Sequence, residues 1–149
     1  MNFVPPINPA FRGSNASAVI IMKGNSFLLQ KRDAKPNVVY GGHWGLFGGA
    51  LEAGEDFVTA AKREIREEIG LNIVPEYVTE LTYKDYFSDT PRNVCRTYFF
   101  VEIGDSDAVD IELHEGNDYG FFTAFEIQNL KMAPYDKFIF DLFWASKYG

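Results

Sequence analysis

Three glutamates, Glu64, Glu67 and Glu68, follow one another at i, i+3 and i+4. On a helix that turns about 100° per residue they share one face, where ionised carboxylates repel one another. A positive charge among them relieves that repulsion. A hard divalent cation such as Mg²⁺ prefers oxygen ligands, typically one or two carboxylates together with water and phosphate. The spacing therefore indicates a metal-dependent site for phosphate chemistry.

A solvated face is the alternative interpretation for any Glu-rich helix. The core-facing stripe of this helix is apolar at helical spacing and comprises Phe57, Val58, Ala61, Ile65 and Ile69. The three glutamates border this stripe, with Glu68 closest to it. Arg63 lies one turn before Glu67 and can fix the rotamer of that side chain. Both observations favour a site over a solvated face.

Glycines stand at both ends of the helical segment. Gly48 and Gly49 precede it, and without Cβ atoms they allow the backbone to approach a metal or a phosphate closely. Gly70 follows the last apolar residue of the stripe, where a left-handed C-cap is expected. The segment therefore has a defined entrance and a defined end.

Residues 49–71 resemble the signature of the Nudix hydrolases, Gly-x5-Glu-x7-Arg-Glu-U-x-Glu-Glu-x-Gly-U, in which U is an aliphatic residue. All nine specified positions match, namely Gly49, Glu55, Arg63, Glu64, Ile65, Glu67, Glu68, Gly70 and Leu71. So many fixed positions make this signal far more specific than a lone glycine-rich loop. The surroundings in 28–32, 44–49 and 113–127 are also similar to the family.

The resemblance implies roles for individual residues. Glu64, Glu67, Glu68 and the carbonyl of Gly48 are expected to bind Mg²⁺, with Mn²⁺ as a possible substitute, while Glu55 buttresses Arg63. Water attacks phosphorus without a covalent intermediate. Its general base is expected to be Glu115, with Glu112 and Asp118 as alternatives, and an ordinary solvated loop acid is the other reading of Glu115. Arg32 and the backbone at Gly49 are expected to contact substrate, although Arg32 equally suits a surface salt bridge.

The implied activity is hydrolysis of a pyrophosphate bond in a nucleoside diphosphate linked to another group, as in a nucleoside triphosphate or a nucleotide sugar. The alternatives are a non-catalytic nucleotide-sensing Nudix module and an RNA 5′-end pyrophosphohydrolase. Sensors commonly lose signature carboxylates, and this chain retains them. A net charge of −7 argues against nucleic acid as a partner, because binding to its phosphates relies on a basic surface.

A length of 149 residues suits one domain, which the resemblance makes a single Nudix domain over 1–149, and residues 1–15 are expected to be an extended N-terminal arm. Hydrophobic residues at 46% and aromatic residues at 16% exclude a disordered chain. Cys95 is the only cysteine, so an intrachain disulfide is excluded. We find neither a signal peptide pattern nor an apolar run long enough to span a membrane, and we expect a cytoplasmic protein without a membrane partner.

The remaining pattern predicts an α/β fold, an α/β/α sandwich with a mixed central sheet. Segments 18–22 and 26–30 flank Lys23-Gly24-Asn25 as a hairpin. We expect a loop over 33–42, strands over 76–87, 96–103, 111–113 and 119–123, a turn over 88–93, an acidic loop over 104–110, and late helices over 125–129 and 135–147, the last of them started by Pro134.

The final helix carries more rings than one face normally buries. Phe138 points roughly 160° away from Phe140, whereas Trp144 lies close to Phe140 on the helical wheel. Large exposed apolar patches are uncommon on monomers. We therefore expect the second face to be covered by the N-terminal arm, through residues such as Phe3, or by a second subunit. Family members are often homodimers, which favours the homodimer.

Overall fold

The computed structural model describes residues 3–36, 38, 40–86, 90–112 and 118–148. Within these residues seven strands form one sheet, in which β3, β2, β1, β6 and β5 lie side by side while β4 pairs with β1 and β7 pairs with β2. The strands are β1 (Ser14–Lys23), β2 (Ser26–Lys31), β3 (Trp44–Gly45), β4 (Phe47–Ala50), β5 (Glu76–Asp85), β6 (Arg92–Glu102) and β7 (Asp118–Thr123). The β1–β6 pair is parallel and the others are antiparallel, so the predicted mixed sheet is confirmed.

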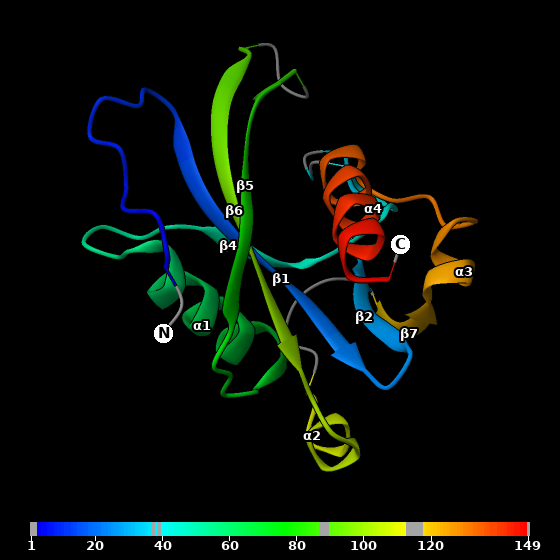
Figure 1. The fold of residues 1–149 in the computed structure, drawn as a ribbon. Coiled ribbons are helices and arrows are strands. Elements are labelled where there is room, and N and C mark those ends of the chain that lie inside the picture. Colours follow the sequence, from blue (N-terminus) through cyan, green and yellow to red (C-terminus); the bar gives the residue numbers. More distant parts are fainter. Residues whose placement is uncertain (1–2, 37, 39, 87–89, 113–117, 149) are drawn as a thin grey trace.

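Helices cover both faces of this sheet. They are α1 (Phe57–Ile69), α2 (Asp105–Val109), α3 (Ala124–Ile127) and α4 (Pro134–Tyr148). Figure 1 shows α1 on one side of the strands and α4 on the other. The predicted α/β/α sandwich is therefore confirmed. No helix in the described part of the chain is long and apolar enough to cross a membrane.

Strand β1 is the centre of both cores because its apolar residues point alternately to the two faces. Ala18 and Ile20 pack with Phe140 of α4, whereas Val19 and Ile21 pack with the α1 side. The hairpin to β2 turns at Gly24, whose φ of 59° is in the left-handed region that favours glycine. The predicted hairpin is confirmed, with strands longer than the sequence suggested.

Helix α1 ends at Gly70 as the sequence predicts, and Asp56, which was not singled out from the sequence, caps its start. The side chain of Asp56 accepts a hydrogen bond from the Thr59 N–H at 2.8 Å and caps the first turn. Gly70 ends the helix with a φ of 76° and donates its N–H to the carbonyl of Arg66. Ala60 is buried on the core stripe, while Val58 lies at its edge and is only partly buried.

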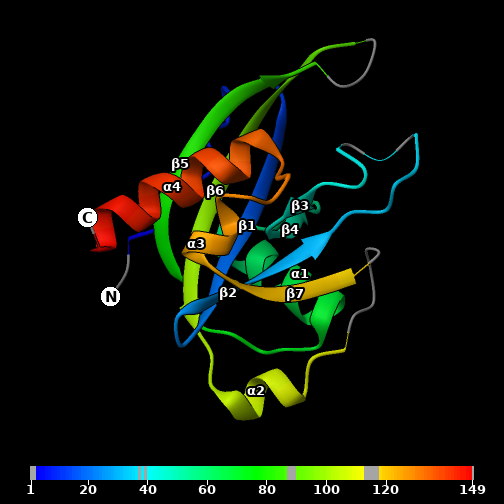
Figure 2. The same cartoon turned by 90° about the vertical axis from the view of Figure 1, so that its right-hand side faces the viewer.

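Several predicted boundaries were wrong. The acidic segment 104–110 contains α2, because Asp107 accepts a hydrogen bond from the Gly104 N–H and places a negative charge near the helix start. Strand β6 begins at Arg92, inside the predicted turn, and α3 begins at Ala124. Of the predicted strand 111–113, the first two residues are irregular, and the third lies outside the described residues. In Figure 2, α2 lies at the opposite end of the molecule from the end of β5 and the start of β6.

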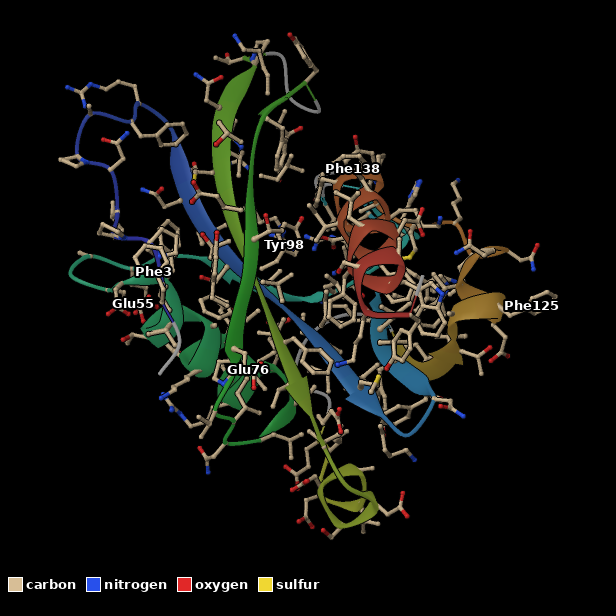
Figure 3. The ribbon with its side chains drawn as sticks, in the orientation of Figure 1. Phe3, Glu55, Glu76, Tyr98, Phe125 and Phe138 are labelled. Atoms are coloured by element: carbon tan, nitrogen blue, oxygen red, sulfur yellow. The ribbon has the colours of Figure 1, made fainter. Side chains whose placement is uncertain are left out.

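The N-terminal arm lies on the α1 side of the sheet. Val4 and Ile7 pack against the α1-side core, and the ring of Phe3 meets Tyr77 edge-on at 6.4 Å. The last two residues of the predicted arm belong to β1. Figure 3 shows Phe3 and Phe138 on opposite sides of the molecule, and Phe138 is 53% exposed. Of the two alternatives for covering the outer face of α4, the N-terminal arm was therefore the wrong one.

Candidate active site

Arg63 on α1 is the hub of the charged residues in the signature. Its guanidinium binds Glu55 in a bidentate manner, with Nε donating at 2.7 Å and Nη2 at 2.9 Å. Nη1 donates to Glu64 at 2.9 Å and to Glu67 at 3.1 Å. Nη2 also donates to the carbonyl of Ala50 at the end of β4. The positive charge among the glutamates is therefore supplied, within the described residues, by a neighbouring arginine.

Glu55 links this hub to the loop before α1, and Figure 3 shows it beside that helix. Besides Arg63 it accepts a hydrogen bond from the Glu52 N–H at 2.8 Å. The hydrogen bond from Arg63 holds the pKa of the Glu55 carboxyl below its usual range, although partial burial opposes this. The hydrogen bond from Glu55 in turn raises the pKa of Arg63. The geometry matches the expected buttress.

Glu68 differs from the other two glutamates because it faces inward and is only 2% exposed. One carboxylate oxygen accepts a hydrogen bond from the Gly48 N–H at 3.0 Å. The other accepts from the amide of Gln30 on β2 at 3.2 Å, and this amide also donates to the Leu46 carbonyl. Glu68 therefore connects α1 to the sheet and to Gly48 and Gly49, which we call the glycine turn.

The two glycines of β4 lie in close contact with their neighbours on both sides. A Cβ atom on Gly49 would lie 2.6 Å from a carboxylate oxygen of Glu64. Gly48 has a φ of 151°, and a Cβ atom there would clash with the Ser17 carbonyl on β1. The carboxylate of Glu64 thus lies directly against backbone that has no side chain.

The groups around Arg63 present oxygen atoms, which are the ligands that a hard cation prefers. Glu64 and Glu67 accept from the same guanidinium nitrogen, so their carboxylates lie close together, and their side chains are 15% and 55% exposed. Two carboxylates beside backbone oxygens match the partial protein coordination that Mg²⁺ typically accepts. In the described part of the chain, however, no three acidic, histidine or cysteine side chains form a preformed metal cage. These residues fit a metal that keeps several water ligands.

A second feature lies on the other side of β4, and we call it the arginine recess. This cavity has a volume of about 180 Å³. It is lined by Ser14, Ala16, Arg32, Gly48, Gly49, Ala50, Tyr83, Asp85, Arg92, Val94, Arg96 and Tyr135. Ala16 and Arg96 are paired in the β1–β6 register and share the sheet face of Ala18 and Tyr98, which belong to the α4-side core. Gly49 thus borders both Glu64 and the recess.

Arg96 is held in the recess by a buried network. Asp136 on α4 accepts hydrogen bonds from the Leu46 N–H and the Tyr98 hydroxyl, each at 3.0 Å. One of its oxygens lies 3.3 Å from Nε of Arg96 in an ion pair. Burial raises the pKa of the Tyr98 hydroxyl, which therefore remains a proton donor to Asp136. Asp136 joins α4, the β3–β4 connection and Arg96.

The other predicted site residues lie in several places. Arg32 lines the recess, and its Nε is buried without a hydrogen-bond partner among the described residues. Glu115 lies outside those residues. Glu112 donates its backbone N–H to Ile69 at the end of α1, and Asp118 is opposite Lys31 in the β7–β2 register. The structure thus brings Arg32 to the same glycines as the signature.

Sequence reasoning missed Arg96, Asp136, Tyr83 and Asp85. Arg96 had a usable signal, because a charged residue in an otherwise apolar strand is seldom fully buried unless it is paired. It alternates with Tyr98 and Phe100 on one face of β6. Its partner Asp136 is 40 positions away on another element, and nothing in the local pattern connects the two.

Comparison with known proteins agrees with this geometry. The NUDIX domain pattern matches residues 12–143. The chain therefore belongs to the Nudix hydrolase family, as the signature indicated.

Individual proteins resemble this chain in sequence or in fold. The chain is 38% identical over 66 residues to the nucleoside triphosphatase NudI of Escherichia fergusonii, and the same holds for NudI of an Escherichia coli strain. These matches cover 44% of this chain and 46% of the relatives, so the chain spans about half the length of the curated proteins it matches. The crystal structure of a MutT protein from Methanosarcina mazei superimposes with a TM-score of 0.77 at 20% identity, over 91% of this chain and 96% of that chain.

A ligand-bound Nudix domain shares the fold as well. It is the NUDIX domain of Shewanella oneidensis NrtR, solved in complex with ADP ribose, with a TM-score of 0.71 at 13% identity. It covers 91% of this chain and 90% of that chain. At identities of 20% and 13%, these two structural matches establish the fold alone.

Replacing Asp136 with Ala should lower the free energy of unfolding by about 3–5 kcal/mol, because it leaves Arg96 charged and buried without its partner. Asp141→Ala on the same helix is the control. Asp141 is part-exposed and pairs with Lys137 one turn away, so its loss should cost less than about 1 kcal/mol. Urea unfolding of both variants measures the difference. Equal losses would contradict the network.

The lowered pKa of Glu55 predicts a pH-dependent contribution to stability. A carboxyl whose folded pKa is depressed stabilises the fold above its unfolded pKa, about 4.3 for Glu, and loses this effect as pH falls through the folded value. The stability difference between wild type and Glu55→Gln should therefore be constant near neutral pH and shrink below about pH 4. Urea unfolding across this range tests it. A stability difference that stays constant as the pH falls would contradict this role of the Glu55–Arg63 pair.

Proposed function

We propose that this protein hydrolyses a pyrophosphate bond of a nucleoside triphosphate in a reaction that depends on a divalent metal. The carrying observation is the arrangement on the two sides of Gly49. On one side of Gly49, Glu64 and Glu67 accept hydrogen bonds from Arg63. On the other side of Gly49 lies the arginine recess. A substrate that crosses the glycines would place its phosphates at the carboxylates and its nucleoside in the recess.

The chain's own residues supply binding and orientation. Glu64, Glu67, Glu68 and the Gly48 carbonyl would hold Mg²⁺ or Mn²⁺. When bound, such an ion neutralises phosphate oxygens and lowers the pKa of a coordinated water. Arg63 fixes the rotamers of Glu64 and Glu67, and Arg32 would contact phosphate from the recess. Water would attack phosphorus, with Glu115, Glu112 or Asp118 accepting its proton.

The choice of a nucleoside triphosphate over a nucleotide sugar rests on the relatives. Over 66 residues the chain resembles proteins named as nucleoside triphosphatases. The complete signature favours an enzyme over a nucleotide-sensing module. The acidic net charge favours a small nucleotide over an RNA 5′ end. Hydrolysis of free nucleotides compared with that of a 5′-triphosphate RNA separates these alternatives.

Glu67→Gln tests the metal site, because Glu67 is exposed and the change removes a ligand charge but little volume. Turnover of nucleoside triphosphates with Mg²⁺ should fall by roughly two orders of magnitude or more. The melting temperature should change little. Glu76→Gln, an exposed glutamate on β5, is the matched control and should retain activity.

Removing metal should have the same effect as the variant. EDTA should abolish phosphate or pyrophosphate release by the wild type, and added Mg²⁺ or Mn²⁺ should restore it. Activity of Glu67→Gln within a few fold of the wild type, or activity that survives EDTA, would contradict the proposal.

We propose in addition that the protein forms a homodimer through the outer face of α4. Phe138 and Leu142 are about half exposed there, and the N-terminal arm lies on the opposite side of the sheet. Light scattering at micromolar concentration should give twice the chain mass of 16.9 kDa. Phe138→Glu should convert the dimer to a monomer, while Phe125→Glu, which changes an exposed ring on α3, should not. A wild-type mass of 16.9 kDa would refute the dimer.

A further inference from the structure

The chain changes its strand partner at Leu46, between β3 and β4. Gly45 is paired with Gln30 of β2. Phe47, two residues later, is paired with Val19 of β1. Leu46 itself belongs to neither strand and is only 1% exposed, so its backbone N–H and carbonyl need partners within the protein.

Two buried side chains supply these partners from opposite faces of the sheet. The Leu46 N–H donates to Asp136 of α4 at 3.0 Å, and the Leu46 carbonyl accepts a hydrogen bond from the side-chain amide of Gln30 at 3.3 Å. Gln30 is 5% exposed, and it shares a face of β2 with Leu28, which packs in the α1-side core. The change of strand partner is therefore held by one polar side chain on each face of the sheet.

The amide of Gln30 also donates to a second acceptor, on α1. It binds Oε2 of Glu68 at 3.2 Å, while the Gly48 N–H donates to Oε1 at 3.0 Å. A carbonyl and an ionised carboxylate only accept hydrogen bonds, so the NH2 group of the amide, and not its oxygen, has to face both of them. An amide NH2 group has two N–H bonds, which matches this pair of acceptors. The neighbours of Gln30 thus determine the orientation of its side chain.

These contacts fix the carboxylate of Glu68 at both of its oxygens. The two donors belong to β4 and β2, so the carboxylate is held relative to two strands of the sheet. The amide of Gln30 is a neutral donor, so it orients this carboxylate without adding a positive charge beside it, unlike the guanidinium of Arg63. Groups that orient a metal ligand in this way raise its affinity for the metal, and the loss of one typically costs about 10- to 100-fold.

We propose that Gln30 is a positioning residue of the candidate metal site and sets its metal affinity through Glu68. This rests on the proposed function, in which Glu68 and the Gly48 carbonyl hold Mg²⁺ or Mn²⁺. The same amide holds the Leu46 carbonyl, two residues before Gly48. Gln30 therefore fixes two groups of the site relative to each other, the carboxylate on α1 and the backbone that leads into the glycine turn.

The test is the binding of Mn²⁺ alone, measured by electron paramagnetic resonance on protein whose folding is checked by circular dichroism. Gln30→Met keeps the length of the side chain and removes both donors. The Kd for Mn²⁺ should rise about 10-fold or more, and Gln30→Asn, which withdraws the amide by one methylene, should raise it as well. Gln128→Met changes the exposed glutamine that ends α3 and is the matched control, whose Kd should equal that of the wild type.

A second control separates the orientation of Glu68 from damage to the strand change. Asp136→Ala removes the other partner of Leu46, and within the described residues Asp136 does not contact Glu68. The Kd of this variant for Mn²⁺ should therefore rise less than that of Gln30→Met. An equal or larger rise would assign the effect to the strand change and overturn the role of Gln30.

Because the binding measurement contains no nucleotide, it also separates this proposal from the proposed reaction. If the wild type binds Mn²⁺ and hydrolyses nucleoside triphosphates, but both Gln30 variants keep the wild-type Kd, the role of Gln30 is overturned while the reaction stands. If the Kd depends on Gln30 in a protein that hydrolyses no triphosphate, the role of Gln30 is supported and the reaction is refuted.

Discussion

The charged half of the site depends on one guanidinium. Arg63 donates to three carboxylates and to a backbone carbonyl, and these acceptors come from the loop before α1, from β4 and from α1 itself. Without this cation the signature would gather like charges on one helical face, which is unfavourable. With it, Glu55 closes the loop and the carboxylates of Glu64 and Glu67 are held in place. A single planar group thus sets the position of both the glycine turn and the candidate metal ligands.

The glycine turn then separates two chemical environments. On the α1 side, acidic side chains surround Arg63. On the α4 side, three arginines line a cavity in a protein whose net charge is −7. Glu68 holds this segment in place by accepting a hydrogen bond from the Gly48 N–H. Two residues earlier in the chain, the Leu46 N–H donates to Asp136 in the same way. The segment Leu46–Gly48 at the start of β4 is therefore held from both faces of the sheet by buried carboxylates.

Sequence predicted the parts of this arrangement that are local. The C-cap of α1, the hairpin turn at Gly24 and the helical spacing of the signature depend on residues within a few positions of one another, and the structure agrees with each of them. It failed where distant segments meet. The pair of Arg96 with Asp136 and the docking of the arm beside α1 are set by tertiary packing. In α2 the local pattern was misread, because a run of acids suits a helix start as well as a loop.

Strand β1 pairs with antiparallel strands on one side of the site and with a parallel strand on the other, and these pairs join segments at different separations along the chain. Its antiparallel partners β2 and β4 follow it closely in the chain, so the glycine turn and the signature helix can form from contacts of short range. Its parallel partner β6 comes much later, since Ser14 pairs with Val94, and closing this longer loop costs more conformational entropy, by about 0.6 kcal/mol per doubling of loop length. Contacts of this range slow folding. The carboxylate side can therefore assemble early, while the recess is completed only when β5, β6 and α4 have joined the sheet.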